Sequence, residues 1–359
     1  MKSKYLDMRN CKALLPKSFD VSMMRDFDMY LDVVNSEPNH KGIVERLIAR
    51  NVKTQNIKFS EDRLLRYDID VLFTIDLEKR QIERKCQDYY AHPEFARTGY
   101  NLRVLAQFSL IYGDGTRWTF RMPLQYLLKG WGDANDGYQC YVHTIKYGST
   151  DALNTTGSNS NKVIERHYSG ITGRNWLKRL EEHLSKVRSG SGNLFHRAWR
   201  DSGEGETMIY VSAMMLLNAS FEAAMAWEEM YVDRWSLAPK GFNMIPGGFK
   251  GFRLLHKHRI TDRVGITLKE RDRAIVEYVR QNPRKGIPNP FMSELWEDDD
   301  FYLRVIEARD KTLSPNQVKQ IRELAELGGS VAQITKEVNA LNETQVKNVL
   351  AGRTYRRIH

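Results

Sequence analysis

Three stretches near the middle of the chain decide the fold: Tyr138-Gln139-Cys140-Tyr141-Val142-His143-Thr144-Ile145, then His167-Tyr168-Ser169-Gly170, then Asn175 to Arg188. The first alternates apolar and polar residues, which predicts a strand, and the second predicts a short strand that ends at the glycine. The third has apolar residues at helical spacing and predicts an amphipathic helix.

The same pattern continues beyond these stretches. Thr207 to Met214 predicts another strand, and Phe221 to Trp235 predicts a helix behind Ser220, a favourable N-cap. The order strand, strand, helix, strand, helix indicates an α+β domain with a small mixed sheet flanked by helices. An Asp114-Gly115 turn between apolar runs predicts a hairpin further upstream, and the first hundred residues suggest a separate α+β module.

Polar side chains fall at the ends of these predicted elements. Arg179 and His183 are four residues apart and therefore share one helix face. The whole set, in chain order, is Tyr141, Tyr168, Arg179, His183, Glu228 and Asn243. Taken singly, each has an ordinary alternative: a tyrosine that packs at a strand end, an arginine on a solvated helix face, a helical glutamate.

In this order and spacing the residues resemble the GIY-YIG nuclease family. Cys140-Tyr141-Val142 stands at the first motif, and Tyr168-Ser169-Gly170 at the second. Ala224 to Glu228 resembles the acidic helix of the family, and Gly241-Phe242-Asn243 its Gly-aromatic-Asn tail. The resemblance covers about residues 138 to 248. Gln139-Cys140 replaces the usual Gly-Ile, and a Ser- and Asn-rich stretch lengthens the gap between the two tyrosines.

The resemblance implies phosphodiester hydrolysis with Mg²⁺ (or Mn²⁺) as cofactor. Glu228 would be the metal ligand, since one carboxylate can hold a Mg²⁺ that keeps several waters. Arg179 would bind the scissile phosphate through its fork of donors. Either motif tyrosine is a candidate base, so Tyr141 and Tyr168 both stay open, and His183 would orient the base or contact phosphate. Asn243 completes the implied catalytic set.

Basic residues cluster around these motifs. The chain has 55 Lys and Arg against 45 Asp and Glu, a net charge of +10, which supports an anionic partner only where the charge gathers. Residues 240 to 260 contain no acidic residue. We therefore expect DNA contacts from Lys178, Lys250, Arg253, Lys257 and Arg259; the alternative is an ordinary solvated surface.

Leu313 to Ile358 predicts three short helices that open at Ser314, Ser330 and Asn342. This segment resembles the helix-turn-helix module of many phage and intron-encoded homing endonucleases. The resemblance would place Thr344, Gln345, Lys347 and Asn348 in the major groove, with Arg353, Arg356 and Arg357 along the backbone. The alternative is a small three-helix interaction module.

Several classes are excluded. With 41% hydrophobic and 28% charged residues, the chain is not intrinsically disordered. Its three cysteines lack a CxxC pair, so neither a disulfide framework nor a zinc site is expected. The first residues lack the apolar run of a secretory signal, and the longest apolar stretch is too interrupted to span a bilayer. We expect no membrane association and a cytoplasmic location, in the host cell if the gene belongs to a phage.

The sequence thus predicts four regions: an N-terminal domain of unknown role (1–130), a GIY-YIG-like nuclease domain (131–260), a connecting segment (261–312) and a helix-turn-helix module (313–359). The expected function is that of a metal-dependent endonuclease on double-stranded DNA, in a phage or intron-type homing setting. Two alternatives stay open: a restriction or defence endonuclease with the same site, and a non-catalytic DNA-binding regulator with a decayed nuclease fold.

Overall fold

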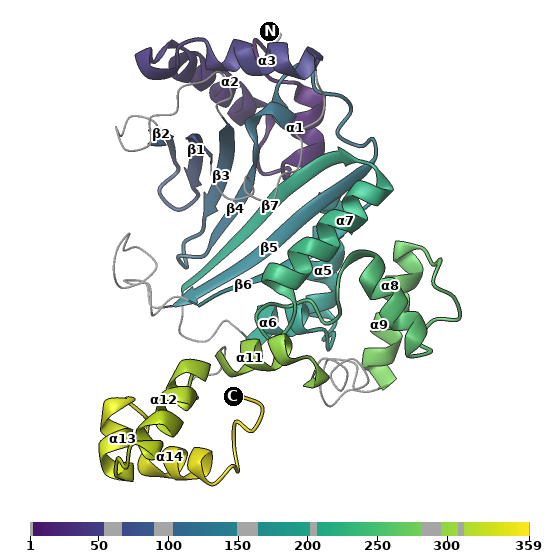
Figure 1. Cartoon of the computed structure of the whole chain (residues 1–359). Helices are drawn as coiled ribbons and strands as arrows, with labels where there is room; N and C mark the ends of the chain where they lie inside the picture. Colours follow the sequence, from purple (N-terminus) through teal and green to yellow (C-terminus); the bar gives the residue numbers. More distant parts are fainter. Residues whose placement is uncertain are drawn as a thin grey trace. The chain divides into compact units, whose positions relative to one another are not determined.

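The computed structural model describes residues 3–53, 67–89, 103–148, 164–201, 207–281, 296–307 and 312–358 (Figure 1). The fold is α+β, as the sequence predicts. Two compact units form: the first comprises residues 1–237 and 241–286, and the second residues 238–240 and 287–359. Among the described helices, none is long and apolar enough to cross a membrane.

The N-terminal part of the first unit is a helical layer over a sheet (Figure 1). Its helices are α1 (Met8–Leu14), α2 (Val21–Ser36) and α3 (Ile43–Lys53), with a short 3-10 helix, η1 (Pro38–His40), between the last two. The side chains of Asp7 and Asp20 cap the first two helices. Apolar residues of these helices, such as Phe27, share one core with Phe73 and Phe108 of the sheet.

Seven strands form one mixed sheet in the order β2-β1-β3-β4-β7-β5-β6. The first four are β1 (Ile69–Asp76), β2 (Gln81–Asp88), β3 (Val104–Ile111) and β4 (Arg117–Pro123), which is followed by a 3-10 helix, η5 (Leu124–Leu127). The expected hairpin at Asp114-Gly115 is confirmed, because β3 and β4 pair antiparallel. The last three are β5 (Tyr138–Gly148), β6 (Ile164–Thr172) and β7 (Thr207–Ala219).

The two halves of the sheet join through β4 and β7, which pair in parallel. The boundary predicted between residues 130 and 131 therefore lies inside the first unit, and the sheet continues across it. In the second half, β5 pairs antiparallel with both β6 and β7. β6 is consequently an edge strand, with one side of its backbone open to partners from outside the sheet.

Helices cover both faces of this half. α5 (Trp176–Arg188) and α6 (Leu194–Asp201) pack on the face that carries Tyr141 and His143. α7 (Phe221–Tyr231), continued by a π-helical turn, η7 (Val232–Ser236), lies across β5 and β6 on the Cys140 face (Figure 1). α8 (Gly248–Lys257) and α9 (Leu268–Gln281) follow.

The second unit contains α11 (Asp299–Glu307), α12 (Pro315–Glu326), α13 (Val331–Glu337) and α14 (Glu343–Leu350). The three helices predicted from the sequence are present, and the side chains of Ser314, Ser330 and Asn342 each cap one of them. Val318, Ile321, Ile334, Val338 and Val346 build the small core.

Candidate functional site

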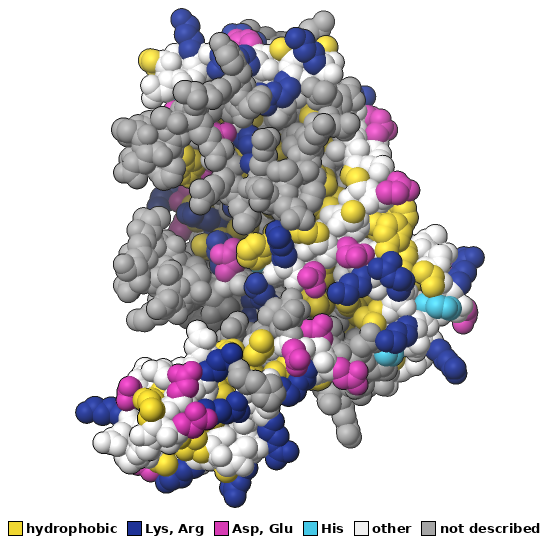
Figure 2. Space-filling view, viewed as in Figure 1, with side chains coloured by type: hydrophobic (Ala, Val, Ile, Leu, Met, Phe, Trp, Pro, Cys, Tyr) yellow, Lys and Arg dark blue, Asp and Glu magenta, His cyan; other side chains and the backbone are white. Residues whose placement is uncertain are grey.

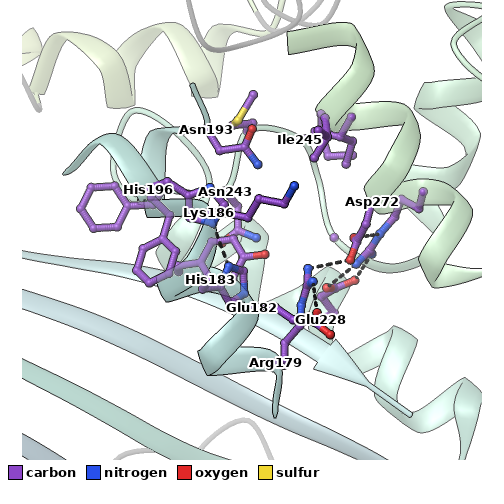
Figure 3. Close-up of a pocket in the computed structure, with 18 of the residues that line it drawn as sticks. Arg179, Glu182, His183, Lys186, Asn193, His196, Glu228, Asn243, Ile245 and Asp272 are labelled. Atoms are coloured by element: carbon purple, nitrogen blue, oxygen red, sulfur yellow. Dashed lines mark hydrogen bonds and ion pairs between the residues drawn. The ribbon is translucent and has the colours of Figure 1, made fainter. Parts of the chain in front are cut away.

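A cavity of about 370 Å³ lies beside the edge strand β6 in the first unit (Figure 3). Five of the six predicted catalytic residues line it: Tyr168, Arg179, His183, Glu228 and Asn243. Arg179 and His183 come from α5 on one face of the sheet, and Glu228 comes from α7 on the other. The two faces can contribute to one cavity because β6 is the last strand.

Tyr141 does not line this cavity. Its side chain is 1% exposed and packs across Gly170, where an added Cβ would lie only 2.6 Å from the tyrosine oxygen. Burial raises the pKa of Tyr141, and the neighbouring Arg179 guanidinium offsets only part of that rise. Tyr141 is therefore placed behind the cavity wall, in contact with the core.

Tyr168 occupies the wall itself. Its ring stacks on Phe195 with centroids 4.6 Å apart and meets His183 edge-on at 5.0 Å. Desolvation raises the pKa of Tyr168, and Arg179 again opposes the rise. Of the two candidate tyrosines, Tyr168 is the one whose side chain reaches the cavity.

Two carboxylates hold the Arg179 guanidinium. Nη1 donates to Glu182 at 3.0 Å, one turn further along α5, and Nη2 donates to Asp272 of α9 at 2.6 Å (Figure 3). The side chain is 18% exposed and faces the cavity. A largely desolvated, fixed guanidinium is suited to binding an oxyanion.

Glu228 is 2% exposed, and both of its carboxylate oxygens are engaged. Oε2 accepts from Nη1 of Arg271 at 2.6 Å and from the backbone N–H of Gly248 at 2.9 Å, and Oε1 accepts from Nη2 of Arg271 at 3.3 Å. Gly248 can approach because it has φ +55° and no Cβ, which would lie 2.3 Å from the Met225 carbonyl oxygen.

The described site does not fit a divalent cation as it stands. Among the described residues, no group of three or more His, Cys, Asp or Glu side chains is placed to hold a metal ion. One carboxylate would suffice for a largely hydrated Mg²⁺. That carboxylate, Glu228, already has the Arg271 guanidinium as its counter-charge.

Buried histidines extend the site inward. His183 Nδ1 lies 2.9 Å from His196 Nε2, and His196 Nδ1 lies 2.8 Å from the Ser191 hydroxyl. Nε2 of His183 has no hydrogen-bond partner among the described residues. Burial lowers the pKa of His183 well below its usual range and that of His196 to about 4. Both imidazoles are therefore neutral near pH 7, and the free nitrogen of His183 can exchange a proton or donate a hydrogen bond.

Asn243 acts on the edge strand. Its Oδ1 accepts from the Ser169 N–H and its Nδ2 donates to the Ser169 carbonyl, both at 2.9 Å. Phe242 adds a further bond from its N–H to the His167 carbonyl at 2.8 Å. The segment thus binds the outer side of β6 and fixes the backbone beside Tyr168. Asn243 is placed to position the site rather than only to line it.

The basic residues predicted to contact DNA in the first unit are all exposed: Lys178, Lys250, Arg253, Lys257 and Arg259. Four of these lie on or just after α8, and Figure 2 shows Lys, Arg and His side chains gathered over the region of α8 and α9. Lys250 lies 3.8 Å from Asp233, and Arg253 lies 3.8 Å from Glu229. Such surface pairs are weak and exchange readily for phosphate.

In the second unit, Thr344, Lys347, Arg353 and Arg356 are exposed. Lys347 pairs with Glu343 at 3.0 Å, and Asn348 is half-buried. Arg356 Nε donates to the Gly352 carbonyl, and two further predicted DNA contacts, Gln345 and Arg357, also have local partners. Gln345 Oε1 accepts from the Leu341 N–H at 2.9 Å, and Arg357 binds Asp299 and the carbonyls of Trp296 and Glu297. Arg357 therefore ties the end of the chain to α11.

Sequence analysis did not identify four residues in or beside the cavity of the first unit. His143 shares the Tyr141 face of β5 and contacts Tyr168 and His183, a placement that strand alternation offers. His196, Arg271 and Asp272 carry no local pattern that marks them, and the last two lie in the segment predicted only to connect domains.

No protein-family model matches this chain, and comparison with curated proteins and with solved structures likewise gives no match. The chemistry of the cavity therefore follows from its own side chains. These combine the cations Arg179, Lys186, Arg271 and Arg273, the carboxylates Glu182, Glu228 and Asp272, a tyrosine and two neutral histidines. A pocket of this kind can bind an anionic group and move a proton beside it.

Proposed function

We propose that the chain is a metal-dependent endonuclease of the GIY-YIG type that hydrolyses phosphodiester bonds in double-stranded DNA. The observation that supports this most is the shared cavity. Tyr168, Arg179, His183, Glu228 and Asn243 come from four separate segments and line one space of about 370 Å³. The antiparallel β6-β5-β7 order with α5 and α7 on opposite faces is the proposed nuclease core.

Arg179 would bind the scissile phosphate, since its fork of donors matches phosphate oxygens. His183 lines the cavity and would accept or relay a proton through Nε2, which is buried and has no partner among the described residues. Tyr168 would present its hydroxyl to the same space. Tyr141, behind the wall, would support Tyr168 and Arg179 rather than meet the substrate.

Mg²⁺, or Mn²⁺ in its place, is the proposed cofactor, and Glu228 would be its ligand once it is released from Arg271. A divalent cation supplies Lewis-acid stabilisation of a phosphoryl oxygen and an acidified water. The α12–α14 helices would form a helix-turn-helix targeting module in a homing endonuclease, with exposed Thr344, Lys347 and Arg353 toward DNA. Palindromic cleavage by a dimer would point instead to a restriction enzyme.

The test is cleavage of supercoiled plasmid by the full chain in Mg²⁺ or Mn²⁺. Glu228→Gln should abolish nicking and linearisation, whereas Glu229→Gln, one residue further along α7, should cleave like the wild type. Equal activity of all three proteins would refute the assignment. DNA binding without cleavage, in the wild type and in every variant, would favour the non-catalytic regulator. The ion pair of Glu228 with Arg271 is consistent with that alternative.

A further inference from the structure

Helix α9 places two adjacent residues of opposite charge against the two proposed catalytic residues of opposite charge. Arg271 donates to both oxygens of Glu228, at 2.6 and 3.3 Å, and Asp272 accepts from Arg179 at 2.6 Å (Figure 3). The same helix lines the cavity with Arg273, Ile275 and Val276. Each proposed catalytic charge therefore already has a partner from one element.

The two contacts match the charges of the missing reactants. The Arg271 guanidinium meets the carboxylate proposed to bind a divalent cation, and the Asp272 carboxylate meets the guanidinium proposed to bind phosphate. The Arg271 guanidinium thus occupies the position proposed for the metal cation, and the Asp272 carboxylate occupies the position proposed for the phosphate. Metal and DNA would therefore compete with α9 for the Glu228 carboxylate and for the Nη2 donor of Arg179.

Little apolar burial holds α9 in place. Of its 14 residues only Arg271 and Val279 are buried, so one of the two anchors is itself a member of the ion pairs. Arg271 is also incompletely satisfied, because its Nε has no hydrogen-bond partner among the described residues. A buried ion pair is weakly stabilising, since desolvation of both charges opposes their attraction. Loss of the helix alone would leave Glu228 buried and unpaired, so its release requires ligands that replace Arg271 and Asp272.

Given the proposed nuclease function, on which this inference rests, we infer that α9 is an autoinhibitory latch on the active site. When docked, it occupies Glu228 and Arg179 and excludes metal and phosphate. When DNA phosphates and a divalent cation bind, they replace Asp272 and Arg271, and the helix leaves the cavity. This explains why the site described above does not fit a metal.

A latch of this kind sets the apparent affinity for metal and DNA. If the released form makes up about one tenth to one hundredth of the protein, the apparent dissociation constants rise about ten- to a hundredfold. Substitutions that remove the latch charges, and leave Glu228 and Arg179 intact, should recover that factor. Loss of a merely structural helix would weaken binding instead.

The first experiment compares Arg271→Gln, Asp272→Asn and the double variant with the wild type in a Mg²⁺ titration of plasmid cleavage. The double variant should reach half-maximal cleavage at about a tenth of the wild-type Mg²⁺ concentration or lower. Arg280→Gln is the matched control, because it removes an exposed ion pair with Glu277 on the same helix. An unchanged or raised Mg²⁺ requirement in the double variant would overturn the latch.

The second experiment locks α9 in place. A Cβ added at Gly192 would lie 3.1 Å from Cγ1 of Val279, so Gly192→Cys with Val279→Cys should form a disulfide when oxidised. Oxidation should abolish cleavage and weaken binding of a DNA duplex measured in EDTA, and reductant should restore both. The two single-cysteine variants are the controls. Full activity and full DNA binding by the oxidised, folded double variant would overturn the latch.

The two experiments distinguish failure of the latch from failure of the proposed nuclease function. Suppose that the wild type cleaves DNA and Glu228→Gln does not. If the Arg271 and Asp272 substitutions leave the Mg²⁺ requirement unchanged, and the disulfide of Gly192→Cys with Val279→Cys leaves cleavage unchanged, the nuclease proposal stands and the latch is wrong. If no protein cleaves under any condition, the nuclease function fails. DNA affinity still tests the latch in that case, because Asp272→Asn should strengthen binding and the oxidised lock should weaken it.

Discussion

Asn243 offers a test of how the end of the edge strand is held in place. Its side chain makes two hydrogen bonds to the Ser169 backbone, each 2.9 Å long, next to Tyr168. In Asn243→Ala both Ser169 groups would lose their partner in a residue that is fully buried. Each unpaired buried backbone group costs about 1–3 kcal/mol, so we expect a loss of roughly 2–4 kcal/mol once water has partly replaced the amide.

The matching change in melting temperature follows from the size of the first unit. A loss of that size lowers the melting temperature of a domain of a few hundred residues by roughly 3–7 °C. Asn243→Asp is the informative companion, because it keeps an acceptor for the Ser169 N–H but loses the donor to the Ser169 carbonyl. Its destabilisation should equal or exceed that of the alanine variant, because a carboxylate oxygen would then face the Ser169 carbonyl oxygen.

Thermal unfolding by circular dichroism measures the loss, and plasmid cleavage well below the lower melting temperature measures activity. We expect Asn243→Ala to cleave less DNA and also to melt at a lower temperature, because both depend on the position of the β6 backbone beside Tyr168. Wild-type melting together with lost cleavage would refute this reasoning, because Asn243 would then act on the substrate instead of on the strand.

Three further outcomes are expected. Arg179→Lys should lower single-turnover cleavage at least about a hundredfold, because an ammonium cannot reproduce the guanidinium fork; wild-type rates would return Arg179 to a structural role. Burial holds the pKa of His196 at about 4. Between pH 6.5 and 4 the unfolded chain therefore binds a proton at this histidine that the native state does not bind. For each unit by which the pH is lowered in that range, the free energy of unfolding should decrease by about 1.4 kcal/mol. Urea unfolding of His196→Gln should show a shallower pH slope, with exposed His256→Gln as control; equal slopes would contradict it. A chain ending after residue 286 should keep the core of the first unit folded and cleave DNA with less site preference, as mapped on a long substrate at matched salt; an unchanged pattern would place recognition in the first unit.

Local sequence patterns were sufficient for the elements of the candidate site. Alternation of side chains indicated β5, and apolar spacing indicated α5, because both patterns repeat within a few residues. Capping chemistry is equally local, and Ser220, Ser314 and Ser330 each cap the helix that they predict. Five of the six proposed catalytic residues line one cavity, and four of them lie within elements that these patterns predicted, β6, α5 and α7.

Features that depend on contacts between distant segments were decided only by the tertiary structure. No periodicity reports that β4 pairs in parallel with β7, so the continuity of the sheet across residue 130 was hidden. Local spacing also leaves ambiguities: of the adjacent apolar residues Val349 and Leu350, the first is buried and the second is 39% exposed.

The pairing of Arg271 with Glu228 joins residues 43 positions apart. Local sequence patterns identified five of the side chains that line the cavity, four of them on regular elements. Only the packing of α9 decided that two of these groups are already paired, because an ion pair between distant segments leaves no trace in the local order of residues.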